Sequence, residues 1–162
     1  MKKSRKKFEK PLKPWDKTRL DEERKISQDY GLRRKKEIWK MESILRNYRR
    51  IARNLAATAN KENEKILLGK LFKMGLINKG DDLDDVLALT TEKLLERRLQ
   101  TMVFRKGLAS TPIQARQFIV HGHIAVDGRK VRWPSMIVPL AEENTISFYE
   151  KSKVKGVKIE KS

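Results

Sequence analysis

The longest regular pattern in the chain is a stripe of apolar residues in its first half. Steps of three and four residues separate its members, which are Ile38, Met41, Leu45, Tyr48, Ala52, Leu55 and Ala59. Because an α-helix has 3.6 residues per turn, this spacing places them on one side of a single helix. A helix of about 26 residues would extend about 39 Å, at 1.5 Å per residue. The first half of the chain must therefore fold around one long amphipathic helix.

The stripe could serve either of two kinds of packing. A coiled coil would need the pattern over many heptads, but this one covers about three and has alanines in its second half. Packing against helices of the same chain is therefore favoured. We expect those helices at 18–30, ending before Gly31, and at 62–77, with Gly75 near its end. The acidic run 81–85 should open a further helix, because carboxylates stabilise a helix N-terminus.

The opposite side of the long helix carries cations, namely Arg33, Arg34, Lys35, Lys36, Lys40, Arg46, Arg49, Arg50 and Arg53. A solvated face is the simplest interpretation of such a run. Few acidic residues alternate with these cations, however, so their repulsion is not relieved within the helix. The whole chain has 39 basic and 21 acidic residues and a formal charge of +18 over 162 residues. These features favour a phosphate-binding face and a polyanionic partner.

A basic arm precedes the helices. Residues 1–14 contain two prolines and little apolar content, and carry the cations Lys2, Lys3, Arg5, Lys6 and Lys7. The arm could simply keep the chain in solution. Phe8 and Trp15, which flank the prolines, instead favour an extended arm that becomes ordered on a partner.

The composition also excludes several classes of protein. The chain has no cysteine, which excludes a disulfide scaffold, cysteine-ligated zinc and thiol chemistry. Its longest apolar stretches, such as 136–141, are too short to cross a membrane, and the basic residues 1–10 do not resemble a secretory signal. We therefore expect an intracellular protein that does not insert into a membrane.

No pattern of catalytic residues is present. The sequence lacks a phosphate-binding loop and a nucleophile with its base, so no enzymatic activity and no small-molecule substrate are expected. His121 and His123 are the only histidines and have no cysteine beside them, which argues against a metal site. We expect no cofactor and no metal.

A second pattern begins at Thr91, which can cap a helix that runs to about Lys106. Arg97, Arg98 and Arg105 would share one flank of that helix with Thr101, with Phe104 beside them. Three guanidinium groups and an aromatic ring on one flank suit contacts with phosphates and exposed bases.

A short helix should follow at Thr111. Thr111, Pro112 and Gln114 fit the cap, first and third positions of a capping box. Gln114, Gln117 and His121 would lie along one line of this helix, with Arg116 well away around it. One of these two sets should contact the partner, and the other could brace a neighbouring element.

The chain then changes to β-structure. Asp127-Gly128 between Ile124–Val126 and Arg129–Val131 is typical of a two-residue β-hairpin, which places Arg129 and Lys130 just past an exposed turn. Met136–Pro139 and Thr145–Tyr149 are expected as further short strands. The fold class is therefore α+β, with a mainly helical N-terminal half followed by a helix–helix–hairpin unit and a short antiparallel sheet.

The order of helix, capped helix, His-Gly-His and hairpin resembles the RNA-binding domain of the small-subunit ribosomal protein S4 family. The matching stretches are Leu95–Leu99, Gln114–Gln117, His121–Gly128 and Pro134-Ser135. In the first half, Pro14–Lys17, Tyr30–Leu32, Glu37–Trp39 and Ile44–Arg46 resemble the archaeal and eukaryotic branch of that family. The resemblance covers about 150 residues, and its specificity for RNA lies in the second half.

The resemblance implies a structural protein of the small ribosomal subunit in the cytoplasm. Such a protein binds small-subunit ribosomal RNA directly, nucleates assembly, lies beside other small-subunit proteins and is located near the mRNA entrance. The implied RNA-binding residues of the domain are Arg97, Arg98, Arg105, Ser110, Thr111, Gln114, Arg116, Gln117, His121, His123, Arg129 and Lys130. To these we add the cations Arg46, Arg49, Arg50 and Arg53 of the long helix and those of the arm.

The expected division is a basic arm at 1–14, a helical domain at 15–90, an RNA-binding domain at 91–150 and a basic tail at 151–162. The alternative function is that of a non-ribosomal RNA-binding factor that acts on stalled or assembling ribosomes. The long helix and the arm disfavour it, because a minimal factor does not need them.

Overall fold

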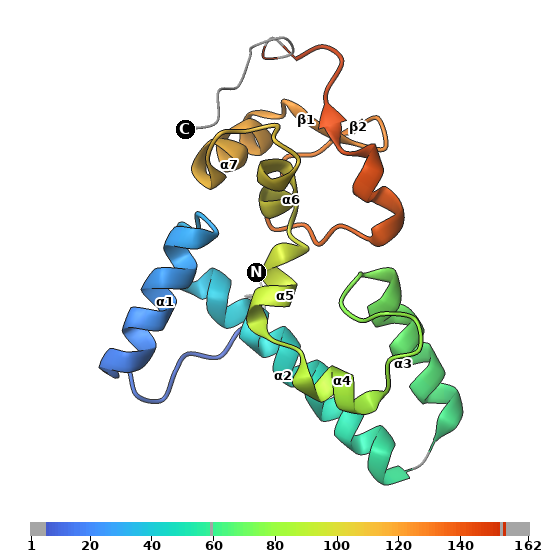
Figure 1. The fold of residues 1–162 in the computed structure, drawn as a ribbon. Coiled ribbons are helices and arrows are strands. Elements are labelled where there is room, and N and C mark those ends of the chain that lie inside the picture. The colour runs from blue at the N-terminus through green and yellow to red at the C-terminus, as the bar shows by residue number, and fades with distance from the viewer. Residues whose placement is uncertain (1–5, 59, 153, 155–162) are drawn as a thin grey trace, which may run out of the picture.

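The protein is a chain of short helices around one long helix, followed by a small sheet (Figure 1). The computed structural model describes residues 6–58, 60–152 and 154, so Lys2, Lys3, Arg5, Ala59 and most of the basic tail lie outside the described residues. The helices are α1 (Lys17–Asp29), α2 (Lys36–Thr58), α3 (Lys61–Lys73), α4 (Leu83–Ala88), α5 (Thr91–Glu96), α6 (Leu99–Arg105) and α7 (Pro112–His121). The strands are β1 (Ile124–Val126), β2 (Arg129–Lys130) and β3 (Ser147–Phe148), and a 3-10 helix, η1, covers Leu140–Thr145. The expected α+β class is confirmed.

The helix α2 is the centre of the first half, as its apolar stripe predicts. Ile38, Met41, Leu45 and Ala52 are buried in a core that α3, α4 and α5 complete. Packing within the chain therefore accounts for the stripe over the residues that the structure describes. No helix of this described part is both long enough and apolar enough to span a bilayer.

The ends of these helices follow local capping rules. Gly31 has a φ of 59° just after α1, the left-handed conformation that ends helices. The acidic run lies at the start of α4, where the Asp82 amide donates to the Asp85 carboxylate at 2.9 Å. The cap of α5 is Thr90 rather than the expected Thr91, since the Thr90 hydroxyl accepts from the Lys93 amide.

The prediction of a single helix from Thr91 to Lys106 is wrong. The structure has two helices, α5 and α6, with Arg97 and Arg98 between them. Here the backbone pairs with a distant segment: the Leu99 amide donates to the Met136 carbonyl at 2.8 Å, and the Val138 amide donates to the Arg97 carbonyl at 2.9 Å. An extended pairing of this kind competes with helical hydrogen bonds, so the helix stops.

The same pairing explains another difference. Residues 136–139 form an isolated bridge between Ile137 and Arg98 instead of a strand of the sheet. The strand expected at Thr145–Tyr149 is present only as β3, because η1 occupies the residues before it.

The second half contains its own core and the small sheet. Leu99, Val103, Ile119 and Ile124 are fully buried there. The sheet has the antiparallel order β2-β1-β3, and the predicted hairpin is confirmed, with Val126 paired to Arg129. The first core includes Leu95 and the second begins at Leu99, so the two cores divide after α5, later in the chain than the expected boundary at residue 90.

The described part of the arm lies along α2 without forming a helix or strand. The Phe8 ring lies 6.0 Å from the Trp39 ring, centroid to centroid, and Glu9 forms an ion pair with Arg46. None of the described residues of the arm, 6–14, belongs to either core. The Glu9 amide also donates to the Ser43 hydroxyl at 3.3 Å, and Arg19 donates to the carbonyls of Lys13 and Pro14. The path of the arm is therefore set by one aromatic contact, one ion pair and a few hydrogen bonds.

Gly31 generates a test of how closely the two halves pack. A Cβ atom built on Gly31 would lie 2.7 Å from the Cβ of Pro112 at the start of α7. We expect Gly31→Ala to lower the free energy of unfolding by about 2–4 kcal/mol, from left-handed strain and overpacking together. Urea unfolding followed by circular dichroism measures it.

The matched control is Gly128→Ala in the hairpin turn. Gly128 also has a positive φ, 70°, but no atom lies within 4 Å of its added Cβ. This substitution should lower the free energy of unfolding by about 1–2 kcal/mol, through left-handed strain alone. If the two variants lose equal amounts of unfolding free energy, close packing at Gly31 is contradicted.

Candidate nucleic-acid interface

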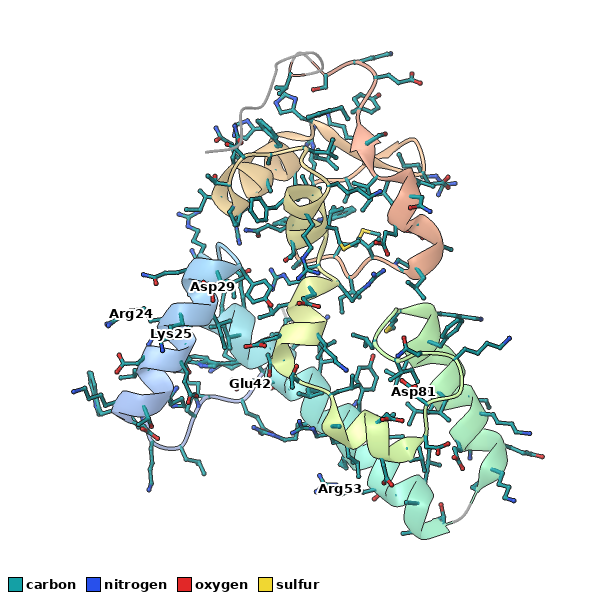
Figure 2. The ribbon with its side chains drawn as sticks, in the orientation of Figure 1. Arg24, Lys25, Asp29, Glu42, Arg53 and Asp81 are labelled. Carbon is teal, nitrogen blue, oxygen red and sulfur yellow. The ribbon has the colours of Figure 1, made fainter. Side chains whose placement is uncertain are left out.

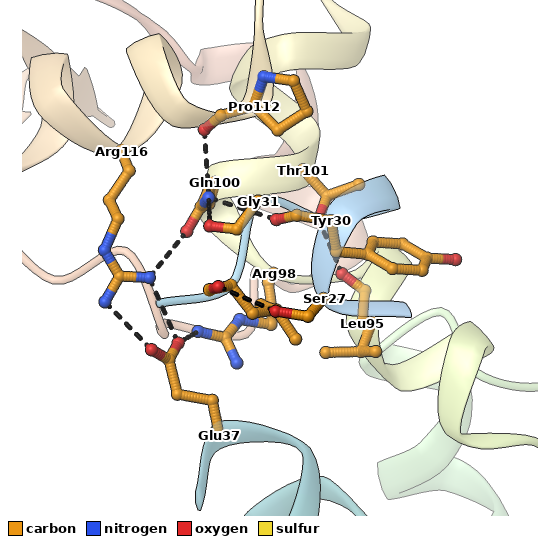
Figure 3. Close-up of polar contacts among 11 residues, drawn as sticks. Ser27, Tyr30, Gly31, Glu37, Leu95, Arg98, Gln100, Thr101, Pro112 and Arg116 are labelled. Carbon is orange, nitrogen blue, oxygen red and sulfur yellow. Dashed lines mark hydrogen bonds and ion pairs between the residues drawn. The ribbon is translucent and has the colours of Figure 1, made fainter. Parts of the chain in front are cut away.

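One carboxylate joins the two halves of the protein. Glu37, in the first turn of α2, accepts from Arg98 Nη2 at 2.6 Å and from Arg116 Nη2 at 3.0 Å (Figure 3). Arg98 precedes α6 and Arg116 lies on α7, so both guanidinium groups come from the second half. These charge-assisted bonds fix α2 against α6 and α7.

Gln100 extends this junction. Its side-chain amide nitrogen lies 2.9 Å from the carbonyl oxygen of Gly31 and 3.0 Å from that of Pro112, while its amide oxygen accepts from Arg116 at 3.3 Å (Figure 3). Gln100 is fully buried, and it connects the end of α1, the start of α7 and the Glu37 cluster. We call Glu37, Arg98, Gln100 and Arg116 the junction cluster.

The charges of the junction cluster affect its ionisation. Burial raises the pKa of the Glu37 carboxyl, but the bonds and charges of Arg116 and Arg98 outweigh burial and hold it below its ordinary value of 4.5. Burial lowers the pKa of Arg98, although a guanidinium group stays protonated at neutral pH. The cluster is therefore a carboxylate with two cations.

Two arginines that the sequence assigns to RNA are turned inward. Arg98 is only 1% exposed, and the Arg97 side chain is 12% exposed and bonds to Glu143 and to the Val138 carbonyl. The expectation that they share an exposed flank with Arg105 is wrong. The helix is interrupted at Arg97 and Arg98, where Arg98 is extended and bridges to Ile137, and both side chains point at protein groups. Thr101 is also buried, and donates to the Leu95 carbonyl at 2.8 Å.

The capped helix α7 behaves partly as expected. Thr111 accepts from the Gln114 amide, but the Gln114 side chain accepts from Ser110 at 2.7 Å instead of reaching back to Thr111. Ser110 and Gln114 thus bond to each other. Arg116, on another side of α7, belongs to the set that braces a neighbouring element, since it bonds to Glu37.

Four exposed candidates of the second half lie around the end of α7 and the hairpin, namely Gln117, His121, Arg129 and Lys130. Thr111 at the start of α7 and Arg105 at the end of α6 are exposed as well. The His121 and His123 rings are nearly parallel, with centroids 6.3 Å apart. His123 is half-buried and its Nδ1 lies 2.9 Å from the Ser152 hydroxyl oxygen, so it is less accessible than His121.

Arg105 is exposed but is also paired with an acidic residue of the protein. Its side chain is 53% exposed and forms an ion pair with Glu96 at 2.7 Å. An exposed pair of this type contributes little to stability, so its guanidinium can exchange Glu96 for another anion at small cost.

The cations of α2 also divide into two groups. Arg50 and Arg53 are exposed, and Figure 2 shows Arg53 on the lower part of α2. Arg49 is half-buried and donates to the Leu89 carbonyl at 2.6 Å, while Arg46 is paired with Glu9 of the arm. Lys6 and Lys7 are exposed beside Arg46 and Arg50, in a pocket of about 310 Å³.

Sequence reasoning missed two features. Glu37 belongs to one of the matching stretches, and an acid that directly follows the four cations at 33–36 could have marked it as an ion-pair candidate. Its actual partners, Arg98 and Arg116, lie far along the chain. Arg132 is exposed, and its Nε would lie 3.3 Å from a Cβ built on Gly122, beside the His-Gly-His stretch. Only the fold brings Arg132 near that stretch. Within the described residues, no group of three or more acidic and histidine side chains could hold a metal ion.

Removing the charge of Glu37 tests the junction cluster. In Glu37→Gln two guanidinium groups lose their counter-charge, and we expect about 3 kcal/mol less unfolding free energy at pH 7. Because the folded pKa is lowered, this contribution is present above pH 4.5 and is lost as pH falls through the folded pKa. The difference between wild type and variant should therefore shrink in acid, as measured by urea unfolding from pH 7 to pH 3.

Glu42→Gln on the same helix is the control. Burial and then the nearby Glu23 raise the pKa of Glu42, so its charged form opposes folding at pH 7 (Figure 2). This variant should be neutral or more stable than wild type. A Glu37→Gln loss that does not exceed that of Glu42→Gln would refute the bracing role.

Two family models match the chain, one in each half. The family model described as ribosomal protein S4/S9 N-terminal domain matches residues 1–96, and the model described as S4 domain matches residues 97–144. The border between the two matched regions falls at Glu96 and Arg97, where α5 ends and the two cores divide.

Archaeal proteins named small ribosomal subunit protein uS4 are similar over most of the chain. The one from Methanococcus aeolicus is 54% identical over 149 residues, which cover 90% of this chain and 84% of that protein. The one from Saccharolobus islandicus is 52% identical over 159 residues, 96% of this chain and 88% of that protein. The one from Methanothermobacter thermautotrophicus is 49% identical over 157 residues, covering 94% and 91%. With both halves matched in order, the chain belongs to the ribosomal protein S4 family.

Proposed function

We propose that this chain is a structural, non-enzymatic constituent of the small ribosomal subunit that binds small-subunit ribosomal RNA. The observation that carries the proposal is the match of both halves to the family, with relatives named as small-subunit proteins at about half identity. It implies a location on the cytoplasmic ribosome, beside other small-subunit proteins.

The division of the arginines into bonded and exposed ones supports an RNA partner. The arginines bonded inside the protein hold the two halves together, while those around the hairpin and on α2 stay exposed. Exposed cations on a braced scaffold can bind phosphates without first ordering the protein, which lowers the entropic cost of binding. The affinity of the protein for RNA would come chiefly from the release of the cations that are bound to the RNA phosphates.

The family resemblance extends the proposal further. It implies a primary binder that joins a helical junction near the 5′ region of small-subunit RNA and nucleates assembly. It also implies a place near the mRNA entrance, where exposed cations could contact mRNA. These two statements rest on the resemblance alone.

Binding of a transcript of the 5′ region of small-subunit ribosomal RNA tests the RNA role. Wild type should bind it more tightly than an unrelated RNA of equal length. Arg129→Gln/Lys130→Gln should reduce the slope of log affinity against log salt by about 1 to 2, since each phosphate contact contributes about 0.7–0.9. Filter binding across a salt series gives both values.

Arg97→Gln supplies the contrast. Its guanidinium bonds to Glu143 and Val138, so the variant should lose stability but keep the salt slope when measured below its unfolding temperature. If Arg97→Gln changes the slope as much as the hairpin variant does, the division between bracing and binding arginines is wrong.

Sedimentation of cell extract on a sucrose gradient distinguishes a structural ribosomal protein from the alternative, a non-ribosomal RNA-binding factor. A structural constituent should be found in the small-subunit peak, in an amount equal to other small-subunit proteins. Its absence there, with recovery only in stalled or immature particles, would instead support the non-ribosomal factor.

A further inference from the structure

The outer side of α3 has a glycine at its centre. Leu67 and Leu71 face the first core, and Gly69 lies two residues from each, about 200° around the helix from both. Gly69 therefore faces away from the core, on a helix that lies at the edge of the first half (Figure 1). Among the described residues, nothing lies within 4 Å of a Cβ atom built on it.

Folding of the chain alone does not explain this glycine. Glycine is the poorest helix former after proline, because it loses the most backbone entropy on folding. At Gly31 the close approach of Pro112 requires the absence of a side chain, but Gly69 has no such neighbour in the described structure and no positive φ. A helix surface without a side chain allows a second backbone to approach closely.

Two hollows adjoin at Gly69. One, of about 490 Å³, lies between α3 and the loop before α4 and includes Phe72. The other, of about 640 Å³, extends towards the start of η1 and includes Ile66 and Pro139. Lys65 and Gly69 line both hollows, so the two meet where a larger side chain at position 69 would separate them. We call the two hollows together the α3 groove.

Large apolar side chains are exposed in and beside the α3 groove. Ile66 is 69% exposed and Phe72 is 38% exposed, and Leu140, which follows Pro139, is 40% exposed. Exposed apolar residues are common when they are scattered singly over a surface. A group of them around one groove is typical of a surface that a protein partner covers.

The side of the α3 groove towards η1 is also positively charged. Lys65, Lys70 and Lys73 line that hollow together with apolar residues and without an acidic residue. All three lysines are exposed, and no ion pair between described residues involves any of them. The groove therefore combines an apolar floor with three cations that can pair with an outside anion.

This combination favours a protein segment over RNA as the occupant. Arginine is the side chain best suited to nucleic-acid recognition, and none of the described residues that line the α3 groove is an arginine. An RNA backbone has no apolar surface with which to cover Ile66. A protein segment can cover Ile66 with apolar side chains while its carboxylates pair with the lysines.

We propose that the α3 groove docks an acidic, amphipathic segment of another protein of the small subunit. The backbone of this segment crosses α3 at Gly69. Its apolar side chains enter the hollow at Ile66 and Pro139, and its carboxylates pair with the three lysines. The proposal rests on the small-subunit function proposed above and names the chemistry of one protein neighbour.

Substitution of Gly69 by alanine tests whether the bare helix surface serves folding. In the isolated full-length chain, Gly69→Ala should raise the Tm by about 2–4 °C, because alanine favours the helix and its methyl group meets open space. Thermal melting followed by circular dichroism measures this shift. A lower Tm would show that the chain itself needs the glycine, and would overturn the proposal.

A leucine at position 69 should block docking. Tagged copies of Gly69→Leu and of the control Asn63→Leu would be purified in small subunits by the tag and a sucrose gradient. Asn63 is exposed on the same helix and lines neither hollow. Quantitative mass spectrometry should show that Gly69→Leu particles have lost one subunit protein, on the order of tenfold, while Asn63→Leu particles keep it. An equal protein content in the two kinds of particle would overturn the proposal.

Photo-cross-linking identifies the occupant. Small subunits that contain Ile66→p-benzoylphenylalanine should, on irradiation, form a cross-link to a protein segment that has both acidic and apolar residues. Mass spectrometry of the cross-linked peptide gives its sequence. A cross-link to RNA, or to a segment without acidic residues, would overturn the proposal.

Binding to the 5′-region transcript separates this proposal from the proposed function. Gly69→Leu should bind the transcript with the affinity and salt slope of wild type, because the groove is not an RNA site. Weaker transcript binding by Gly69→Leu than by Asn63→Leu would make RNA the occupant and refute the protein partner. Absence of the wild-type chain from the small-subunit peak would refute the proposed function itself.

Discussion

The arrangement of the two halves depends on a single shared carboxylate. Glu37 holds Arg98 and Arg116 at once, and Gln100 joins the same cluster to the end of α1 and the start of α7. A buried ion pair does not by itself make a fold more stable than apolar packing would. Its value here is geometric, because directional bonds set how α6 and α7 lie against α2.

The second constraint is the extended backbone between α5 and α6. By pairing with residues 136–138, it turns Arg97 and Arg98 towards protein acceptors and ends the first core at Leu95. The arginines of this basic protein thus divide into those that brace the halves and those that face solvent. The first set determines where the second set lies, and so links folding to recognition.

The formal charge of +18 leaves many cations of the chain without an acidic counterpart. On the hairpin and on α2, exposed basic side chains outnumber the exposed acids that could neutralise them. The chain belongs to the ribosomal protein S4 family, and its match to the S4 domain fits a ribosomal RNA partner.

The sequence by itself determined the features that local rules govern. The spacing from Ile38 to Leu55 specified α2, and Asp127-Gly128 specified the hairpin, because both depend on periodicity and turn chemistry. The motifs also identified the family. The end of α5, the inward Arg97 and Arg98, and the role of Glu37 depend on contacts between residues 37 to 79 positions apart, such as Leu99 with Met136 and Arg116 with Glu37. Helical spacing cannot reveal a partner that distant in the chain, so only the tertiary structure decided which arginines face solvent and which hold the protein together.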